Sequence, residues 1–272
     1  MQNGSEHQQM VTENILQMQR DQRYNIVNQE YLEFLLTQNY QYNFSWFGRP
    51  IIQIPQDIYA LQEMVWQTKP DLIIETGIAH GGSLVLAASL MAQLDMLEAL
   101  TEQSASQKLT FFRKRHVLGV DIEIREHNKV ALLEHPLNPY YTLIEGSSIS
   151  KSVINKVKRF TSKYEKIMLL LDSNHTHSHV LKELQAYAPL VSVGCYLVVW
   201  DSGIEDVSET TNKIIKKNRP WARGNNPKTA LIEYLDLAKN AGETYQINSQ
   251  LRTKIGISSA SDAFLRKVGK GQ

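Results

Sequence analysis

Four acidic residues lie at or near the ends of apolar segments, a placement that can build a binding site. They are Glu75 in "LIIET", Asp121 in "HVLGVD", Asp172 in "KIMLLLD" and Asp201 in "CYLVVWD". Short apolar runs separated by helix-length segments predict parallel strands, and the carboxyl ends of parallel strands meet at one edge of a sheet. Ligands of such sheets bind at that edge, so we expect these acids to border a ligand site.

Three glycines, Gly77, Gly81 and Gly82, follow Glu75 in "ETGIAHGGS". Glycines permit a tight strand-to-helix turn and the close approach of a ligand. The spacing matches neither the G-x-G-x-x-G of dinucleotide-binding proteins nor a phosphate loop. An acid before the turn would repel a pyrophosphate but attract an amino group, and Asp121 can accept hydrogen bonds from ribose hydroxyls. The pattern predicts a ligand with a positive head group and an unphosphorylated ribose, such as S-adenosylmethionine.

Asp172 and Asp201 end neighbouring predicted strands and suit a divalent cation. Carboxylate oxygens are the ligands that Mg²⁺ prefers. A bound cation would hold a substrate hydroxyl and lower its pKa. His175, three residues after Asp172, could accept the hydroxyl proton, because histidine is a common general base at neutral pH.

The histidines of "DSNHTHSH" leave a second interpretation open. A metal-dependent hydrolase or hydroxylase would bind its metal through Asp172 and some of His175, His177 and His179. The spacing argues against all three histidines binding one ion, because His175 and His179 are one helical turn apart while His177 points elsewhere. We expect at least one of His177 and His179 to be structural. A third possibility is a non-catalytic protein that binds the cofactor without a working acceptor site.

The elements that must position these residues alternate between strands and helices from residue 57 onward. This order predicts an α/β fold of three layers, with a mostly parallel seven-stranded sheet and helices on both faces. Residues 1–50 form a separate helical and irregular extension, and residues 51–272 form the main domain. The further expected elements are helices over 57–69, 83–100, 207–218 and 227–240, a polar connection over 101–108, a strand over 141–146, and an antiparallel edge hairpin of 244–248 with 254–258.

The composition excludes several classes of protein. The 272 residues carry a formal net charge of +1, with 42% hydrophobic and 21% charged residues. We therefore expect no nucleic-acid or membrane partner, and no run suggests a transmembrane helix. Cys195, the single cysteine, excludes an internal disulfide and a cysteine metal cluster, and we expect it to be buried and inert. The sequence is typical of a cytoplasmic protein, and aromatic residues near its N-terminus favour a homo-oligomer.

Four motifs together resemble the family named after cephalosporin hydroxylase. They are "NFSWFGRPIIQIPQDI", "DLIIETGIAHGGS", "DSNHTHSHVLKEL" and "RPWARGNNPKTA", and the resemblance covers about residues 40–265. It implies a class I methyltransferase fold for the main domain. It also implies an S-adenosylmethionine-dependent O-methyltransferase that acts on a hydroxyl of a small molecule or sugar, assisted by a metal such as Mg²⁺.

The resemblance also assigns roles to individual residues. It implies that the turn from Glu75 to Ser83, which includes Ala79, holds the methionine end of the cofactor. Asp121 would bind the ribose and Ser147 would contact the adenine side. Asp172 would lie beside the cofactor as the first metal ligand, with His175 as the general base.

One departure from the family pattern affects the metal site. Relatives tend to carry two adjacent acids after the fifth strand, whereas this chain has Trp200, Asp201 and Ser202. Depending on the register, Trp200 or Ser202 stands where a carboxylate is expected, so Ser202 joins Asp172 and Asp201 as a candidate ligand. Glu205 and Asp206 are close enough in sequence to substitute for the missing acid. Candidate walls of the acceptor site are the stretch around Trp46 and "NNPKTA" (225–230).

Overall fold

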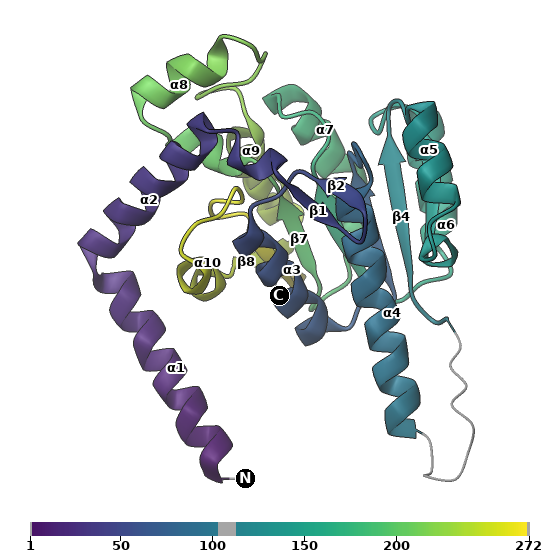
Figure 1. The fold of residues 1–272 in the computed structure, drawn as a ribbon, viewed down its shortest axis with the longest axis horizontal. Helices are drawn as coiled ribbons and strands as arrows, with labels where there is room; N and C mark the ends of the chain where they lie inside the picture. Colours follow the sequence, from purple (N-terminus) through teal and green to yellow (C-terminus); the bar gives the residue numbers. More distant parts are fainter. Residues whose placement is uncertain (1, 103–112, 271–272) are drawn as a thin grey trace.

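A seven-stranded sheet with the order β5-β4-β3-β6-β7-β9-β8 runs through the protein (Figure 1). The structure is a computed structural model and describes residues 2–102 and 113–270. Strands β5 to β7 pair in parallel, and β9 is antiparallel to both of its neighbours. This confirms the predicted fold class. The strands are β3 (Leu72–Thr76), β4 (His116–Asp121), β5 (Tyr141–Glu145), β6 (Ile167–Leu171), β7 (Tyr196–Val199), β8 (Glu243–Ile247) and β9 (Phe264–Lys270).

Helices cover both faces of the sheet because β4 and β5 are added on one side of β3, whereas β6 and β7 are added on the other. Parallel strands are joined by right-handed crossovers, so helices that connect strands toward β5 and those that connect strands toward β7 lie on opposite faces. The change of direction between β3 and β6 creates the edge where ligands bind. The helices after the N-terminal segment are α3 (Pro55–Thr68), α4 (Gly82–Glu102), α5 (Glu126–Leu133), α6 (Lys151–Thr161), α7 (His177–Tyr187), α8 (Glu209–Lys216), α9 (Pro227–Asn240) and α10 (Ser249–Ile255).

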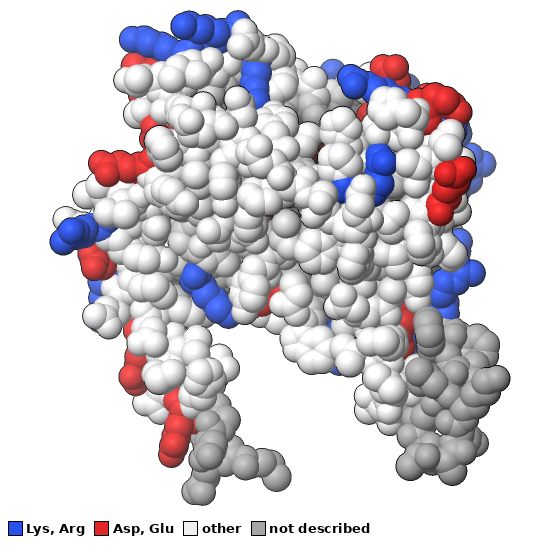
Figure 2. Space-filling model, viewed as in Figure 1, with Lys and Arg blue, Asp and Glu red and all other residues white. Residues whose placement is uncertain are grey.

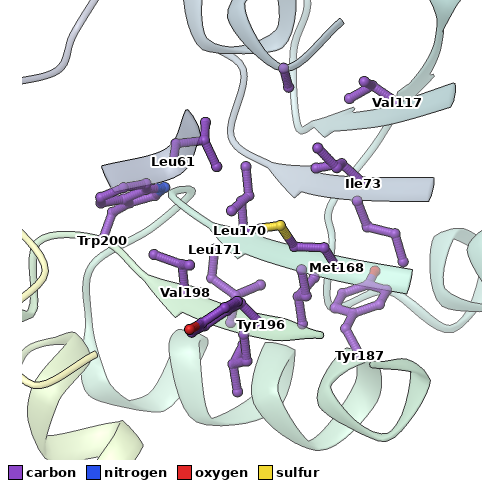
Figure 3. Packing of buried hydrophobic residues seen from close by; sticks show 14 of the residues in the cluster. Leu61, Ile73, Val117, Met168, Leu170, Leu171, Tyr187, Tyr196, Val198 and Trp200 are labelled. Atoms are coloured by element: carbon purple, nitrogen blue, oxygen red, sulfur yellow. The ribbon is translucent and has the colours of Figure 1, made fainter. Parts of the chain in front are cut away.

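The core lies on both sides of the central strands. All residues of β3 and β6 are buried, which explains why these strands are apolar throughout instead of alternating. Figure 3 shows Leu61 of α3 beside Trp200 near one end of the sheet, and Tyr187 of α7 packed near Met168. Cys195 is buried without a disulfide, as predicted, and burial raises the pKa of its thiol to about 11.

The edge hairpin differs from the prediction. Strand β8 pairs with β9, whereas residues 249–255 form helix α10, so the prediction of a strand over 254–258 is wrong. Asn248 caps α10 by accepting a hydrogen bond from the Leu251 N–H at 3.0 Å. Strand β9 is hard to recognise in the sequence because Lys267 occupies a buried position, where its ammonium pairs with Glu243 at 3.2 Å.

The N-terminal extension runs along the outer edge of the molecule and then returns to the sheet. Figure 1 shows α1 (Gln2–Arg20) and α2 (Gln22–Thr37) on this edge, followed by the hairpin of β1 (Phe44–Trp46) and β2 (Arg49–Ile51). Glu33 of α2 accepts hydrogen bonds from the backbone and hydroxyl of Ser208 and from the Thr211 hydroxyl. These bonds tie α2 to the start of α8.

Two sequence-based expectations concern α4 and the segment after it. Residues 103–112, which include most of the predicted polar connection, lie outside the described residues. Helix α4 itself has the length and apolar composition of a membrane-spanning helix over Gly82–Thr101, which the sequence analysis did not anticipate. However, 61% of that window is buried inside the protein, where α4 packs against β4 and the β1–β2 hairpin.

Candidate active site

A cavity of about 580 Å³ opens at the carboxyl ends of β3, β6 and β7. Of the residues singled out in the sequence, seven line it: Gly77, Ala79, Gly82, Ser83, Asp172, His175 and Asp201. Five others lie outside its wall: Glu75, Gly81, Asp121, Ser147 and Ser202. The fold therefore brings the glycine turn and the Asp–His segment together around one space.

The glycine turn needs glycine because of its backbone path and its close neighbours. Gly77 has φ +83°, and an added Cβ would lie within 3.0 Å of backbone atoms of Asp172. Gly82 begins α4 against the β2 strand, where a Cβ would lie equally close to the backbone of Pro50. Gly81 also has a positive φ and faces the Leu132 side chain. The turn thus packs so closely against its neighbours that a side chain at Gly77 or Gly82 would displace the backbone of Asp172 or Pro50.

The Asp121 side chain stabilises this turn through hydrogen bonds. Its Oδ2 accepts hydrogen bonds from the N–H groups of Ile78 at 2.9 Å and Ala79 at 3.1 Å, and its Oδ1 accepts one from Glu123. Ser147 lies in the loop after the neighbouring strand β5, partly buried, with its carbonyl accepting the Ser150 N–H. The ribose and adenine roles of these two residues remain predictions, and the structure gives Asp121 a supporting role besides.

Glu75 is a buried acid with one oxygen free of partners. Its Oε1 accepts a hydrogen bond from the Ser83 hydroxyl, whereas its Oε2 has no hydrogen-bond partner among the described residues. Burial, together with the nearby charge of Asp121, raises the pKa of Glu75 to about 8, although the Ser83 bond acts in the opposite direction. An ammonium group close to Oε2 would stabilise the ionised form. Glu75 does not itself line the cavity, but Ser83, which donates a hydrogen bond to it, does, so the pairing of Glu75 with an amino group stays a prediction.

Asp172, His175 and Asp201 form a compact cluster at the ends of β6 and β7. One ligand atom from each lies within 4.8 Å of the other two, and the His175 Nε2 is 3.4 Å from Asp201 Oδ2. Burial and repulsion from Asp201 and Glu75 hold the pKa of Asp172 well above its usual range. Gln53, which the sequence analysis missed, donates to Asp172 Oδ2 at 3.3 Å. Two carboxylates and an imidazole fit a divalent cation, which would relieve this repulsion.

The missing acid of strand β7 is not replaced by any candidate in the described chain. Ser202 is fully buried and donates its hydroxyl to the Ser261 carbonyl at 2.8 Å, so Ser202 points away from the cluster, contrary to the prediction. Trp200 packs edge-on against Phe264 in the core. Glu205 accepts hydrogen bonds from Gly224 and Asn226. Asp206 pairs with Lys228 at 2.8 Å, so His175 is the third ligand-type residue of the cluster.

Asp201 reaches the cluster through an unusual backbone conformation. It has φ +56°, in the left-handed region that aspartate rarely occupies. Such a conformation costs on the order of 1–3 kcal/mol and concentrates at functional sites. The turn after β7 therefore turns the Asp201 carboxylate toward His175 while the neighbouring side chains enter the core.

His177 and His179, the other two histidines of "DSNHTHSH", have structural partners, as expected. His177 lies between Thr229 and Glu233 of α9, at 2.9 and 3.0 Å from its two ring nitrogens. His179 contacts the Ser148 hydroxyl at 3.1 Å and the buried Glu183 at 3.6 Å. Neither lines the cavity, so a metal site built from several histidines does not form.

The rest of the cavity wall agrees only in part with the expected walls. Tyr42 and Pro50, from the stretch around Trp46, line the cavity. Trp46 itself donates to the Ser89 hydroxyl at 3.0 Å, and residues 225–230 do not line the cavity, since Asn226 caps α9. The actual wall combines the end of α2 and the turn after it with the end of α8 and the loop after it. Residues from these segments are Leu36, Thr37, Asn39, Gln41 and Tyr42, and Ile214, Ile215, Asn218, Arg219 and Trp221; the stretch 50–54 contributes Pro50, Ile52, Gln53 and Ile54.

Comparison with known proteins places this geometry in a family. The family model described as Rhamnosyl O-methyltransferase/CmcI matches residues 38–268. The chain belongs to this family. The rhamnosyl O-methyltransferase of Mycobacterium tuberculosis (strain H37Rv) is 28% identical over 211 residues, which cover 77% of this chain and 72% of that protein. The corresponding Mycobacterium leprae protein is 28% identical over 161 residues, covering 59% of this chain and 61% of that protein.

A solved structure of a family member shares the fold. The apo structure of CmcI-N160 has a TM-score of 0.51 and 16% identity, and the match covers 84% of this chain and 77% of that chain. Family membership confirms the resemblance drawn from the sequence motifs. The match begins at residue 38, so it includes Asn39, Gln41 and Tyr42 of the cavity wall but neither α1 nor α2.

Proposed function

We propose that the protein is an S-adenosylmethionine-dependent O-methyltransferase that methylates a hydroxyl group of a sugar or similar small molecule. The observation that carries this proposal is that the glycine turn and the Asp172–His175–Asp201 cluster line one cavity. The first is suited to the cofactor and the second to activating a hydroxyl. The relatives named rhamnosyl O-methyltransferase support a sugar as the acceptor.

Different residues around the cavity have different roles in the proposed reaction. A divalent cation such as Mg²⁺, held by Asp172 and Asp201, would supply Lewis-acid chemistry that lowers the pKa of the acceptor hydroxyl. His175 accepts the hydroxyl proton, and Asp201 at 3.4 Å stabilises the imidazolium that forms. Bound S-adenosylmethionine would supply the methyl group, so that the acceptor oxygen would gain a bond to the methyl carbon as the carbon–sulfur bond is lost, with a methyl ether and S-adenosylhomocysteine as products. Positioning of the two substrates in line supplies much of the rate.

The first test is cofactor binding. We expect calorimetric titration to show saturable binding of S-adenosylhomocysteine, weakened at least about 10-fold by Glu75→Ala because a charge-assisted hydrogen bond is lost. Titrations with and without Mg²⁺ then measure how far the cation contributes to S-adenosylhomocysteine affinity. An absence of binding under both conditions would contradict the proposal and return attention to metal-dependent hydrolysis or hydroxylation.

A second test separates two roles of His175. If His175 is the general base and not a metal ligand, His175→Ala should lower turnover about 100-fold or more. The affinities for the divalent ion and for the cofactor should then stay nearly unchanged. A large fall in ion affinity would instead identify His175 as a metal ligand. Unchanged turnover would exclude both roles.

The assembly of the protein is a further part of the proposal. Helix α2 exposes four large apolar side chains on the side away from its buried residues: Ile26, Val27, Tyr31 and Phe34, which are 47–58% exposed. Water-exposed apolar helix faces of this kind are typical of subunit contacts, and a second copy of the chain would cover this one. Light scattering should give a mass above that of one chain, and Phe34→Glu should lower it. A monomeric wild type would contradict this. A cytoplasmic location remains a prediction.

A further inference from the structure

The end of α8 carries a local excess of positive charge at the mouth of the cavity. The segment 209–223 contains five cationic residues and one acid, in a chain whose formal net charge is only +1. Figure 2 shows Lys and Arg side chains gathered over α8. Glu209 pairs with two of the five, Lys213 at 4.0 Å and Arg223 at 3.7 Å. The remaining three, Lys216, Lys217 and Arg219, have no ion pair within the described residues.

Arg219 is the one of these residues that lines the cavity, and it is held in place. Its guanidinium donates to the Tyr42 hydroxyl at 2.9 Å and lies 5.6 Å from the ring of Trp221. Both partners also line the cavity, one from the N-terminal extension and one from the loop after α8. A guanidinium ordered by neutral neighbours keeps donors available for an anion, and its planar fork suits phosphate or carboxylate oxygens.

The indole of Trp221 connects this arginine to the reacting end of the cavity. The Trp221 ring is edge-on to His175, with 4.8 Å between the ring centroids, and its other neighbour is Arg219. The indole N–H is buried and has no partner among the described residues. One side chain therefore separates the general base from the guanidinium, so a small acceptor can present its hydroxyl to His175 and an anionic group to Arg219 at the same time.

We propose that the acceptor is an anionic sugar, whose phosphate or carboxylate binds Arg219 with support from Lys216 and Lys217. This inference rests on the proposed methyltransferase function and narrows its substrate class. The distribution of charge agrees with it, because Asp172 and Asp201 cluster with His175, whereas the Trp221 ring lies between His175 and Arg219. An anionic group is thereby kept away from the two carboxylates and beside the only lysine- or arginine-type residue among the described lining residues.

Binding of small probes tests the inference without knowledge of the acceptor. The probes are uridine diphosphate for the phosphate source, D-glucuronate for the carboxylate source and methyl rhamnoside as the neutral comparison. Each is titrated calorimetrically into the full chain in the presence of S-adenosylhomocysteine. We expect at least one anionic probe to bind more tightly than methyl rhamnoside. Arg219→Met should weaken that binding on the order of 10- to 100-fold, the effect of losing a charge-assisted hydrogen bond.

Two variants serve as controls. Arg219→Lys keeps the charge and should lose less affinity than Arg219→Met. Arg159→Met on α6 makes the same change in net charge at an exposed residue outside the cavity wall and should leave binding unchanged. An equal loss in Arg159→Met, no loss in Arg219→Met, or binding of neither anionic probe would overturn the anion site. S-adenosylhomocysteine affinity is measured in the same samples. A wild-type protein that does not bind S-adenosylhomocysteine would overturn the proposed function instead of the anion site.

Discussion

The two halves of the cavity are built in different ways. The half that we assign to the cofactor depends on close backbone packing: Gly77 and Gly82 face other backbone segments within 3.0 Å of where a Cβ would lie, and Asp121 accepts hydrogen bonds from two N–H groups of the turn. The acceptor half is made of side chains from α2, α8 and the loops that follow them. Backbone contacts of this kind leave no room for change, whereas an exposed wall of side chains can be altered without moving the sheet.

This difference predicts that side chains of the acceptor half can be replaced without disturbing the glycine turn. Cofactor binding depends on a turn that few sequences can form. Acceptor binding depends on side chains such as Tyr42, Arg219 and Trp221, whose replacement leaves the turn intact. Substitutions in the cofactor half should therefore damage stability and binding together, whereas substitutions in the acceptor half should change binding alone.

The largest expected effect is that of Gly77→Ala. The substitution combines a positive φ with a contact against the backbone of Asp172, which cannot move aside as a side chain could. Gly242→Ala is the matched control, since Gly242 has φ +77° but no atom within 4 Å. We expect Gly242→Ala to cost about 1–2 kcal/mol of unfolding free energy and Gly77→Ala at least about 2 kcal/mol more, with loss of S-adenosylhomocysteine binding. Equal unfolding free energies for the two variants would contradict the steric account.

Asp172 lies where the two halves of the cavity meet. Its replacement in Asp172→Asn should lower activity without lowering stability. The amide removes a buried charge that Asp201 and Glu75 repel, so the metal-free protein should be as stable as the wild type or more stable. Turnover should fall about 100-fold or more, the scale of losing one electrostatic contact to the reacting group, and divalent-ion affinity should fall with it. Thermal unfolding and ion titration measure the two effects. A destabilised variant would show that Asp172 is a structural residue.

Glu75→Gln should change the pH dependence of the cofactor half. The pKa of Glu75 is about 8 in the folded protein, against an ordinary value of 4.5. A raised carboxyl pKa means that the folded state binds the proton more tightly, so this contribution to stability is present at low pH and is lost as the pH rises from 4.5 to about 8. Relative to Glu75→Gln, the wild type should lose a few kcal/mol across this window, since each pKa unit corresponds to about 1.4 kcal/mol.

The same residue gives a measurable proton release on binding. If the ligand ammonium pairs with the Glu75 carboxylate, then S-adenosylhomocysteine binding near neutral pH must ionise Glu75. Calorimetry in buffers of different ionisation enthalpy should detect this proton in the wild type and not in Glu75→Gln. Parallel pH–stability curves for the two proteins would contradict the buried-acid account.

The smallest expected effect belongs to the acceptor half. Tyr42→Phe removes the hydroxyl that accepts a hydrogen bond from Arg219, a contact worth about 1 kcal/mol or less at a partly exposed site. The acceptor KM should rise a few-fold, while cofactor affinity and unfolding temperature stay unchanged. A fall in cofactor affinity would show that the two halves are coupled, contrary to the comparison drawn above.

Much of the fold and part of the site could be predicted from the sequence. The central parallel strands β3, β6 and β7 were recognisable because strands buried on both faces are continuous apolar runs, and strand β3 matches its predicted bounds, 72–76. Strand β9 was missed because the buried Lys267 interrupts its apolar pattern. Ser202 and residues 225–230 were assigned to the wrong places, and of the stretch around Trp46 only neighbours such as Tyr42 and Pro50 line the cavity, since a sequence does not reveal which way a side chain points after a turn.

By itself, the sequence determined the sheet, the glycine turn and the acids at the strand ends, because these depend on local periodicity and on the backbone freedom of glycine. Only the tertiary structure decided which residues share the cavity. It placed His175 rather than Ser202 beside Asp172 and Asp201, and it brought Tyr42 to Arg219 across 177 positions of the chain. Such contacts arise from the packing of distant segments, and no local pattern in the sequence encodes them.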